Sequence, residues 1–396
     1  MGGAMISFSL SDEDSAIRDL AHNFAEKEIR PIISDREWLQ DPTKRIPWEV
    51  VEEGSKLGFR TMTVPTEFGG LDCSLSTLIL VLEELSWGDL GVAIIFEQTL
   101  KTVRRIARLG SIEQKSDLFP SFMKNNRYVM SGAVTEPAHG SDKILAPARV
   151  RLETRATRNA DEWILNGTKH FITNGSEALL FLVTATKEPV EDDNWWTILM
   201  VPRETEGLEI SRIHEKIAQR LSNNAEISFT DCRIPLKNEL GTSDSRRLES
   251  PRFWMESNIE AAAMMMGTAR AALESALYFA RERIQSGKRI IEHQAVGLMF
   301  AEMKTMIEST NALILRAAWE TEQPRPEYKL GSMAKYQAAE SSFTVCRKAV
   351  EVMGGSGIMM EHPAQKYLRD SLSAFHFDGT QQITLLRIMN SLIDNS

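Results

Sequence analysis

A carboxylate stands among aromatic residues near the end of the chain, in the segment Phe375-His376-Phe377-Asp378-Gly379-Thr380. A carboxylate beside aromatic side chains can act as a general base, because an apolar environment raises its affinity for a proton. Gly379 lets the backbone approach a ligand closely. Asp378-Gly379 is also an ordinary turn signal. The segment therefore indicates a catalytic corner only if other segments supply a binding site.

Two further segments carry groups that could hold a flat heteroaromatic ring. Val134-Thr135-Glu136-Pro137-Ala138-His139-Gly140-Ser141-Asp142 combines hydroxyl groups with a glycine directly after a β-rich run. Thr168-Lys169-His170-Phe171-Ile172-Thr173-Asn174-Gly175 offers a ring at Phe171 for stacking and a hydroxyl at Thr173 for a ring nitrogen. A surface loop and an edge strand are the alternative interpretations of these two segments.

Composition narrows the class of protein. The chain has 396 residues and a formal net charge of −9, which predicts about two or three domains and argues against a general nucleic-acid binder. It lacks a run of about 18 apolar residues, so no membrane span is expected. Met1 to Ile6 lacks the layout of a signal peptide. Scattered cysteines without a C-x-x-C motif fit a cytoplasmic protein, and the seven histidines lack metal-ligand spacing, so no metal site is predicted.

The elements that must position these groups fall into three parts. Apolar residues at helical spacing predict an N-terminal all-helical domain over residues 5–126. The helices expected there cover residues 10–37, interrupted at Pro31, and 46–58, 75–86, 91–108 and 111–123.

Short β-rich runs separated by turn clusters follow, and they predict a small barrel or sandwich over residues 127–241. The runs are 128–134, 150–158, 162–165, 178–186, 195–202 and 225–229. Residues 242–247 are expected to form a polar linker. Helical spacing then returns over 253–286, 292–321, 327–354, 363–373 and after Thr380, which predicts a bundle over residues 242–396. The predicted fold class is mainly α with a β middle domain.

In this order, the segments resemble the acyl-CoA dehydrogenase family of flavoproteins. The motifs Thr135-Glu136-Pro137-x-x-Gly140-Ser141-Asp142 and Phe171-Ile172-Thr173-Asn174-Gly175 are similar to the family's two flavin-binding signatures. Further matches are Pro65-Thr66-Glu67-Phe68-Gly69-Gly70, Arg283-x-x-x-Gly287-Lys288 with Glu292-His293-Gln294, Gly354-Gly355-Ser356-Gly357, and Arg369-Asp370. The resemblance covers essentially the whole chain. It implies the family fold of an N-terminal helical domain, a middle β domain and a C-terminal four-helix bundle.

The resemblance implies an FAD-dependent acyl-CoA dehydrogenase of fatty acid metabolism. Asp378 occupies the position where most members carry the glutamate that removes the α-proton of the acyl thioester, while a hydride passes from the β-carbon to flavin N5. Electron-transfer flavoprotein is the implied acceptor, and a homotetramer built as a dimer of dimers is the implied assembly. The implied FAD-binding residues are Val134, Thr135, Gly140, Ser141, Phe171, Thr173, Arg283, Gln285, Ser286, His293, Gln294, Gly354, Gly355, Thr380 and Gln382. The implied substrate-binding residues are Ser141, Glu97, Ser257, Asn258, Phe377 and Gly379.

Several positions depart from the family pattern. Asp378 is one methylene shorter than the usual glutamate, and Asn258 stands where the family often has an arginine for CoA. Ser286 replaces an aromatic residue that usually packs on the neighbouring flavin, and Phe171 replaces a frequent tryptophan. Glu97, near the base of the family's acyl pocket, would favour a polar or short acyl group.

Two alternatives follow from these departures. Nitroalkane oxidase, a relative on the same fold, also has an aspartate at this position, with a serine that corresponds to Ser257. Its assisting arginine corresponds to Leu385 or Leu386, and Arg387 is expected on another face of the helix. The other alternative is a flavin- or acyl-binding scaffold with little turnover. The sequence leaves open which acyl group is bound and whether oxygen or electron-transfer flavoprotein accepts the electrons.

Overall fold

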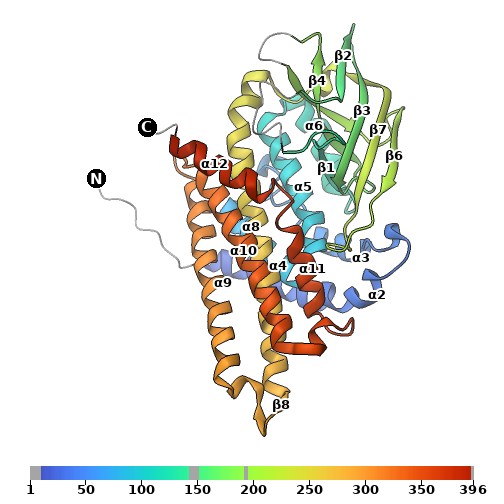
Figure 1. Cartoon of the computed structure of the whole chain (residues 1–396). Coiled ribbons are helices and arrows are strands. Elements are labelled where there is room, and N and C mark those ends of the chain that lie inside the picture. Colours follow the sequence, from blue (N-terminus) through green and yellow to red (C-terminus); the bar gives the residue numbers. More distant parts are fainter. Residues whose placement is uncertain (1–9, 142–150, 191–194, 394–396) are drawn as a thin grey trace.

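The computed structural model describes residues 10–141, 151–190 and 195–393. A helical N-terminal part, a curled β sheet and a long helical bundle follow one another along the chain (Figure 1). This order agrees with the predicted fold class. The sequence-based expectations for Met1 to Ile6, Asp142 and Val150 concern residues outside the described ranges.

The N-terminal part is helical throughout, but its first predicted helix is broken. The segment 10–37 forms α1, a π-helical turn at Ala25–Ile29, a 3-10 turn at Arg30–Ile32 and α2, because Pro31 cannot continue a regular helix. The helices are α1 (Asp12–Phe24), α2 (Ile33–Glu37), α3 (Trp48–Lys56), α4 (Leu75–Gly88), α5 (Leu90–Leu109) and α6 (Ile112–Lys124). The side chain of Asp89 caps α5 by accepting from the backbone N–H of Val92. Because α5 packs against α4, against the bundle and against the sheet, its polar side chains must find partners inside the protein.

The middle part is one seven-stranded sheet in the order β1-β4-β2-β3-β7-β6, with β5 on the other edge of β4. Its strands are β1 (Met130–Ala133), β2 (Arg155–Asn159), β3 (Glu162–Thr173), β4 (Leu180–Glu188), β5 (Trp196–Pro202), β6 (Leu208–Ile213) and β7 (Asn224–Pro235). The strand predicted at 162–165 continues to Thr173. Most of the segment 168–175, which resembles the family's second flavin-binding signature, therefore belongs to a strand paired with β7. The sequence analysis missed β6, because Leu208, Ile210 and Ile213 of this edge strand do not alternate regularly with polar residues and none of its residues is fully buried.

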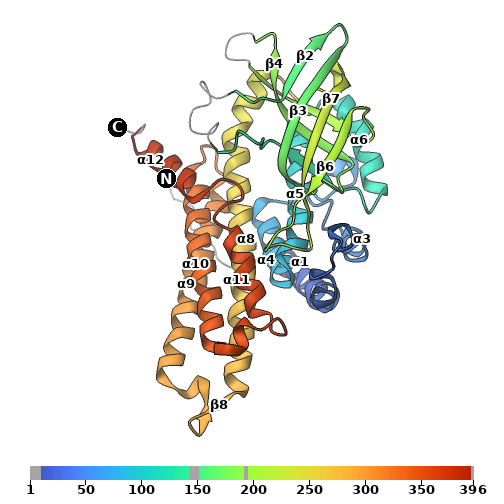
Figure 2. The same ribbon diagram turned by 45° about the vertical axis from the view of Figure 1, so that its right-hand side comes forward.

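The C-terminal part is a bundle around one long helix, α8. The helices are α8 (Ser243–Glu282), α9 (Gln294–Glu320), α10 (Lys329–Met353), α11 (Ala364–Ser373) and α12 (Gln381–Ile393), and a hairpin of β8 (Ile284–Gln285) and β9 (Lys288–Arg289) joins α8 to α9. Figure 2 shows α8, α9, α10 and α11 running side by side. The predicted linker at 242–247 is wrong: Thr242 caps α8 through a reciprocal hydrogen-bonded pair with Ser245, so the helix already begins at Ser243.

The contact of α8 with α4 joins the bundle to the N-terminal part. Small residues line α8 there, and the hydroxyl of Ser86 on α4 donates to the carbonyl of Met264 at 2.7 Å. A Cβ on Gly267 would lie 2.1 Å from the carbonyl oxygen of Glu83, so only glycine fits this crossing. None of the helices in the described part of the chain combines the length and apolar character needed to cross a membrane.

Candidate active site

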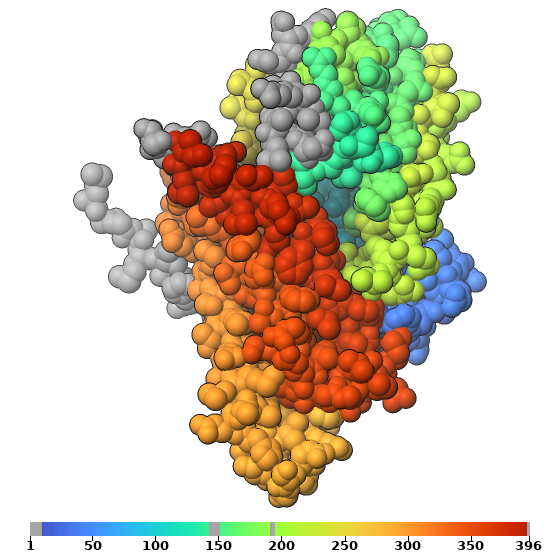
Figure 3. Space-filling view, viewed as in Figure 1, coloured from blue at the N-terminus to red at the C-terminus, as the bar shows by residue number. Residues whose placement is uncertain are grey.

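One cavity of about 1010 Å³ lies where α5, the sheet and the segment before α12 meet. Figure 3 shows a hollow between the C-terminal segment, coloured red, and the green sheet. The residues around this cavity come from α5, the loop after β1, the end of β3, the segment before β7, the start of α8 and residues 372–380. Distant parts of the sequence therefore contribute to one site.

The sheet side of the cavity brings together one group of the predicted FAD residues. Val134, Thr135, Gly140, Ser141, Phe171 and Thr173 all line it. The ring of Phe171 is 59% exposed, which leaves an apolar plane open to the cavity. A Cβ added at Gly140 would meet no atom within 4 Å, so ligand atoms could approach this backbone closely. An open plane, hydroxyl groups and accessible backbone are groups that fit a flavin ring.

Buried charges fix the loop that carries Val134 and Thr135. The ammonium of Lys169 on β3 donates to the carbonyl of Val134 at 3.1 Å and to the carboxylate of Glu136 at 2.7 Å, and both charged side chains are fully buried. Burial lowers the pKa of Lys169 to about 8, although the Glu136 carboxylate opposes this change. The N–H of His170 donates to the carbonyl of Thr135 at 2.8 Å. These contacts thus hold together the loop after β1 and strand β3, which carry the two segments similar to flavin-binding signatures.

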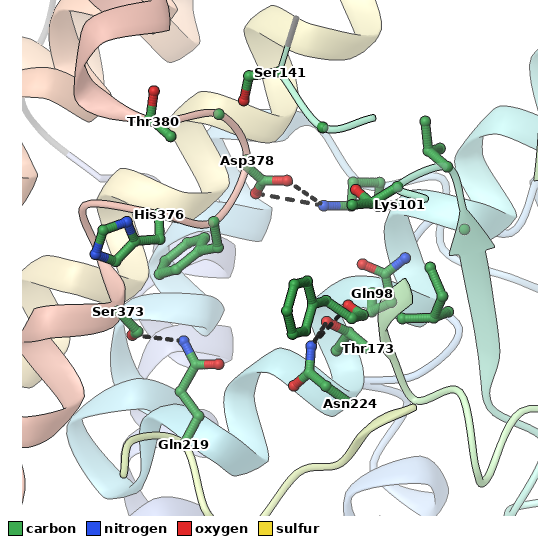
Figure 4. A pocket seen from close by; sticks show the side chains of 18 of the residues that line it. Gln98, Lys101, Ser141, Thr173, Gln219, Asn224, Ser373, His376, Asp378 and Thr380 are labelled. Atoms are coloured by element: carbon green, nitrogen blue, oxygen red, sulfur yellow. Dashed lines mark hydrogen bonds and ion pairs between the residues drawn. The ribbon is translucent and has the colours of Figure 1, made fainter. Parts of the chain in front are cut away.

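Asp378 faces this cavity from the opposite wall (Figure 4). Its φ of +52° and the φ of +97° at Gly379 make a left-handed turn just before α12. Backbone carbonyls hold the turn: the side chain of Asn258 donates to that of Asp378 at 3.4 Å, and Lys335 donates to that of Gly379 at 2.5 Å. Phe377, Gly379 and Thr380 also line the cavity, beside Asp378.

The Asp378 carboxylate contacts a lysine that the sequence analysis did not select. Lys101 Nζ lies 3.1 Å from Asp378 Oδ1 and 2.8 Å from Glu97 Oε1. Burial raises the pKa of Glu97 to about 8, against the attraction of the Lys101 charge. Burial would lower the pKa of Lys101, but the charges of Asp378 and Glu97 outweigh it and raise that pKa. The available sequence signal was weak, a lysine four residues after a glutamate in an apolar helix.

The remaining predicted residues lie elsewhere. The side chain of Glu97 lies behind Lys101, and Ser257 is fully buried, so neither belongs to the cavity wall. Gln382 is exposed on α12 outside the wall. The other predicted FAD residues form a second group, away from the cavity, near the β8–β9 hairpin and the turn after α10 (Figure 1). This group consists of Arg283, Gln285, Ser286, His293, Gln294, Gly354 and Gly355.

Arg387 lies beside the turn that carries Asp378, but it is not among the described residues that line this cavity. Its guanidinium lies over the ring of Trp254, 5.1 Å from the centroid, and 4.0 Å from the position of a Cβ on Gly379. Burial lowers the pKa of Arg387 while the charge of Asp378 opposes that change. Helix periodicity alone could not place this side chain, because the turn before α12 sets the rotation of the helix.

Comparisons with known proteins agree with this fold. Family models described as the N-terminal, middle and C-terminal domains of acyl-CoA dehydrogenase match residues 11–126, 131–232 and 255–393. The probable acyl-CoA dehydrogenase YngJ of Bacillus subtilis is 32% identical over 98% of this chain and 100% of its own length. The mitochondrial short-chain specific acyl-CoA dehydrogenase of Rattus norvegicus is 30% identical over 98% and 92%.

Solved structures show the same likeness. Butyryl-CoA dehydrogenase from Megasphaera elsdenii has a TM-score of 0.90 at 28% identity and covers 98% of this chain and 100% of its own. A chain from the structure of the electron transferring flavoprotein of Acidaminococcus fermentans has a TM-score of 0.89 at 29% identity, with coverage of 98% and 99%. The fold and site define an FAD-dependent oxidoreductase. The chain belongs to the acyl-CoA dehydrogenase family, as its sequence motifs predicted.

Proposed function

We propose that this chain is an FAD-dependent acyl-CoA dehydrogenase that oxidises a CoA thioester between its α and β carbons, with Asp378 as the base. The observation that carries the proposal is the shared cavity. The Asp378 carboxylate lies on one wall. It faces the loop after β1 and the end of β3 on the other wall, which carry the segments similar to flavin-binding signatures. A thioester between them would offer its α-proton to Asp378 and its β-carbon to the flavin.

Each wall has a distinct task. FAD, when bound, accepts the hydride. The open ring of Phe171 and the hydroxyl of Thr173 would hold the flavin, and the side-chain amide of Asn224 donates to Thr173 Oγ1 at 3.2 Å and orients it. Asp378 accepts the proton at its carboxylate. Its side chain is 16% exposed, so substrate binding can exclude the remaining water from the proton transfer.

A second cavity supports CoA as the carrier. It has a volume of about 540 Å³ and shares Arg105, Val134 and Trp254 with the first cavity. Its wall combines cationic side chains with aromatic rings, the groups that bind phosphates and an adenine base. These residues are Arg105, Arg247, Lys329, Arg387, Trp195, Trp196, Trp254 and Tyr328. They supply positive charge that Asn258 does not.

We also propose a homotetramer built as a dimer of dimers. The second group of predicted FAD residues lies at the far end of the bundle, so these residues would meet a flavin only in another copy of the chain (Figure 1). Exposed apolar side chains at the same end support a contact there, with Ile284 63% and Ile358 64% exposed. The likeness to a chain from an electron transferring flavoprotein structure supports electron-transfer flavoprotein as the acceptor.

Anaerobic flavin reduction tests the function. The purified yellow protein is mixed with a panel of acyl-CoAs and, separately, with nitroethane, and the flavin absorbance is followed. We expect an acyl-CoA to bleach the flavin, and Asp378→Asn to retain FAD while the reduction rate falls roughly 100- to 10,000-fold. The matched control is Asp72→Asn, because Asp72 is exposed and also has a left-handed φ, +45°.

The outcomes separate the readings. Full activity in Asp378→Asn would remove this residue from the base role. Bleaching by nitroethane and by no acyl-CoA would replace the proposed function with a nitroalkane oxidase. If no compound of the panel bleaches the wild-type flavin, the dehydrogenase proposal is rejected for those acyl groups.

A further inference from the structure

Lys101 is a charged residue on α5, a helix whose residues are mostly buried. It lies on α5 in line with Gln98, Thr102 and Arg105, all of which face the cavity. Its side chain is only 7% exposed. A lysine is almost never this buried unless it is paired, because removing an ammonium from water is strongly unfavourable. The pairing of Lys101 therefore decides what the residue does.

The ammonium of Lys101 contacts oxygen atoms of three side chains, of which the first forms an ion pair with it and the other two accept its hydrogen bonds. They are Glu97 Oε1 at 2.8 Å, Asp378 Oδ1 at 3.1 Å and Ser257 Oγ at 3.2 Å. Lys101 therefore joins α5, α8 and the turn before α12 at one atom.

The Asp378 carboxylate depends on this contact. The other hydrogen bonds of the turn, from Asn258 and Lys335, end on backbone carbonyls and leave the side chain free to rotate. Among the described residues, Lys101 is the only side chain that donates to the carboxylate, at 3.1 Å to Oδ1 and 3.5 Å to Oδ2. One ammonium thus determines where the carboxylate stands above the cavity.

We propose that Lys101 is a positioning residue for Asp378, an inference that rests on the proposed role of Asp378 as the base. An aspartate has a shorter reach than a glutamate, so the proton transfer tolerates less freedom in its carboxylate. A displacement of about 1 Å can lower the rate of such a step by about 100-fold. Glu97 also contributes, because its carboxyl group forms an ion pair with the same ammonium at 2.8 Å.

The test compares Lys101→Met with Lys348→Met. Lys348 is also a poorly exposed lysine in an ion pair, with Glu302, but it lies outside the cavity wall. Butyryl-CoA serves as the reductant, and binding of its product crotonyl-CoA to the oxidised enzyme reports affinity without turnover. We expect Lys101→Met to keep its FAD and to bind crotonyl-CoA within about twofold of wild type, while flavin reduction slows roughly 10- to 100-fold. Lys348→Met should match wild type in all three measurements.

A second variant guards against misfolding. Removing Lys101 leaves Glu97 buried without its cation, so the double variant Lys101→Met/Glu97→Gln replaces both by neutral groups of similar size. We expect the same slow reduction with unchanged binding. Wild-type reduction rates in either folded variant would overturn the proposal, and so would a loss of crotonyl-CoA affinity that equals the loss of rate. If nitroethane reduces the wild-type flavin and thioesters do not, the same variants are compared with nitroethane as the reductant. That comparison separates failure of this inference from failure of the proposed function.

Discussion

Replacing Glu256 by glutamine should destabilise the protein by an amount that its surroundings define. Glu256 on α8 is 1% exposed, and three arginines surround its carboxylate. Arg108 binds both oxygens, at 2.6 and 2.8 Å, while Arg252 lies at 2.9 Å and Arg104 at 3.1 Å. Arg104 also forms an ion pair with Glu260 at 2.5 Å. The network therefore joins α5 to α8 about one helical turn along α5 from Lys101.

The magnitude follows from the pKa of Glu256. Burial would raise this pKa, but the charges of Arg104 and Arg108 and the hydrogen bonds from Arg108 and Arg252 outweigh burial and lower it from 4.5 to about 2. At ~1.36 kcal/mol for each tenfold change in proton affinity, the charged form contributes about 3 kcal/mol to folding. Breaking a buried ion pair typically costs about 3–5 kcal/mol, which agrees. With an unfolding entropy of about 2.1 cal/mol/K per residue, Glu256→Gln should lower the Tm by about 4 °C.

Scanning calorimetry of the FAD-bound protein checks this value. Because the folded-state pKa is depressed, the contribution is complete above about pH 4.5 and is lost as pH falls toward 2. The Tm gap between Glu256→Gln and wild type should therefore be full at about pH 7 and about two-thirds as large at about pH 3.5. The control Glu351→Gln removes a carboxylate from a half-exposed ion pair with Arg347 and should leave the Tm unchanged. Equal Tm values for Glu256→Gln and wild type at neutral pH would refute this account of the network.

Two further predictions concern charged side chains that are buried next to the cavity. The raised pKa of Glu97 stabilises the fold below about pH 4.5 and loses its effect as pH rises through about 8, so the wild-type Tm should fall more than that of Glu97→Gln between about pH 6 and 9; parallel Tm curves would contradict this. Lys169→Met leaves the buried Glu136 uncompensated, so we expect a loss of about 3–5 kcal/mol and weaker FAD binding in equilibrium titrations. Lys237→Met, at an exposed lysine, should bind FAD as wild type does, and equal FAD affinity in Lys169→Met would refute the anchoring of the loop.

Local patterns predicted the parts of the fold that local forces determine. Apolar spacing indicated most of the helices, and Pro31 indicated the break in the first, because these signals act within a few residues. The start of α8 was missed because its first turns are polar. The cap at Thr242 can be recognised in the sequence once the helix is known to begin there. The edge strand β6 escaped for the same reason, since a half-buried strand needs few apolar residues.

The candidate site was predictable only in part. The two segments similar to flavin-binding signatures and the Asp378 turn could be found, because each is a short motif whose functional groups are close together in the sequence. The pairing of Lys101 with Asp378 joins residues 277 positions apart, and no local pattern announces such a contact. The same holds for Arg387, whose direction depends on the left-handed turn that precedes α12. The sequence thus located the candidate reacting groups, whereas the contacts that restrain them depend on tertiary packing.

The glycine at the crossing of α4 and α8 has an influence that reaches beyond its own contact. Gly267 lets the two helices touch, with no room for a side chain against the Glu83 carbonyl. Since α4 leads through Asp89 directly into α5, this contact sets the depth at which α5 is seated against α8. The position of α5, which carries Gln98, Lys101 and Thr102 of the cavity wall, therefore depends on a contact outside the cavity. Changes in the width of this catalytic pocket during evolution can arise at a residue that touches neither cofactor nor substrate.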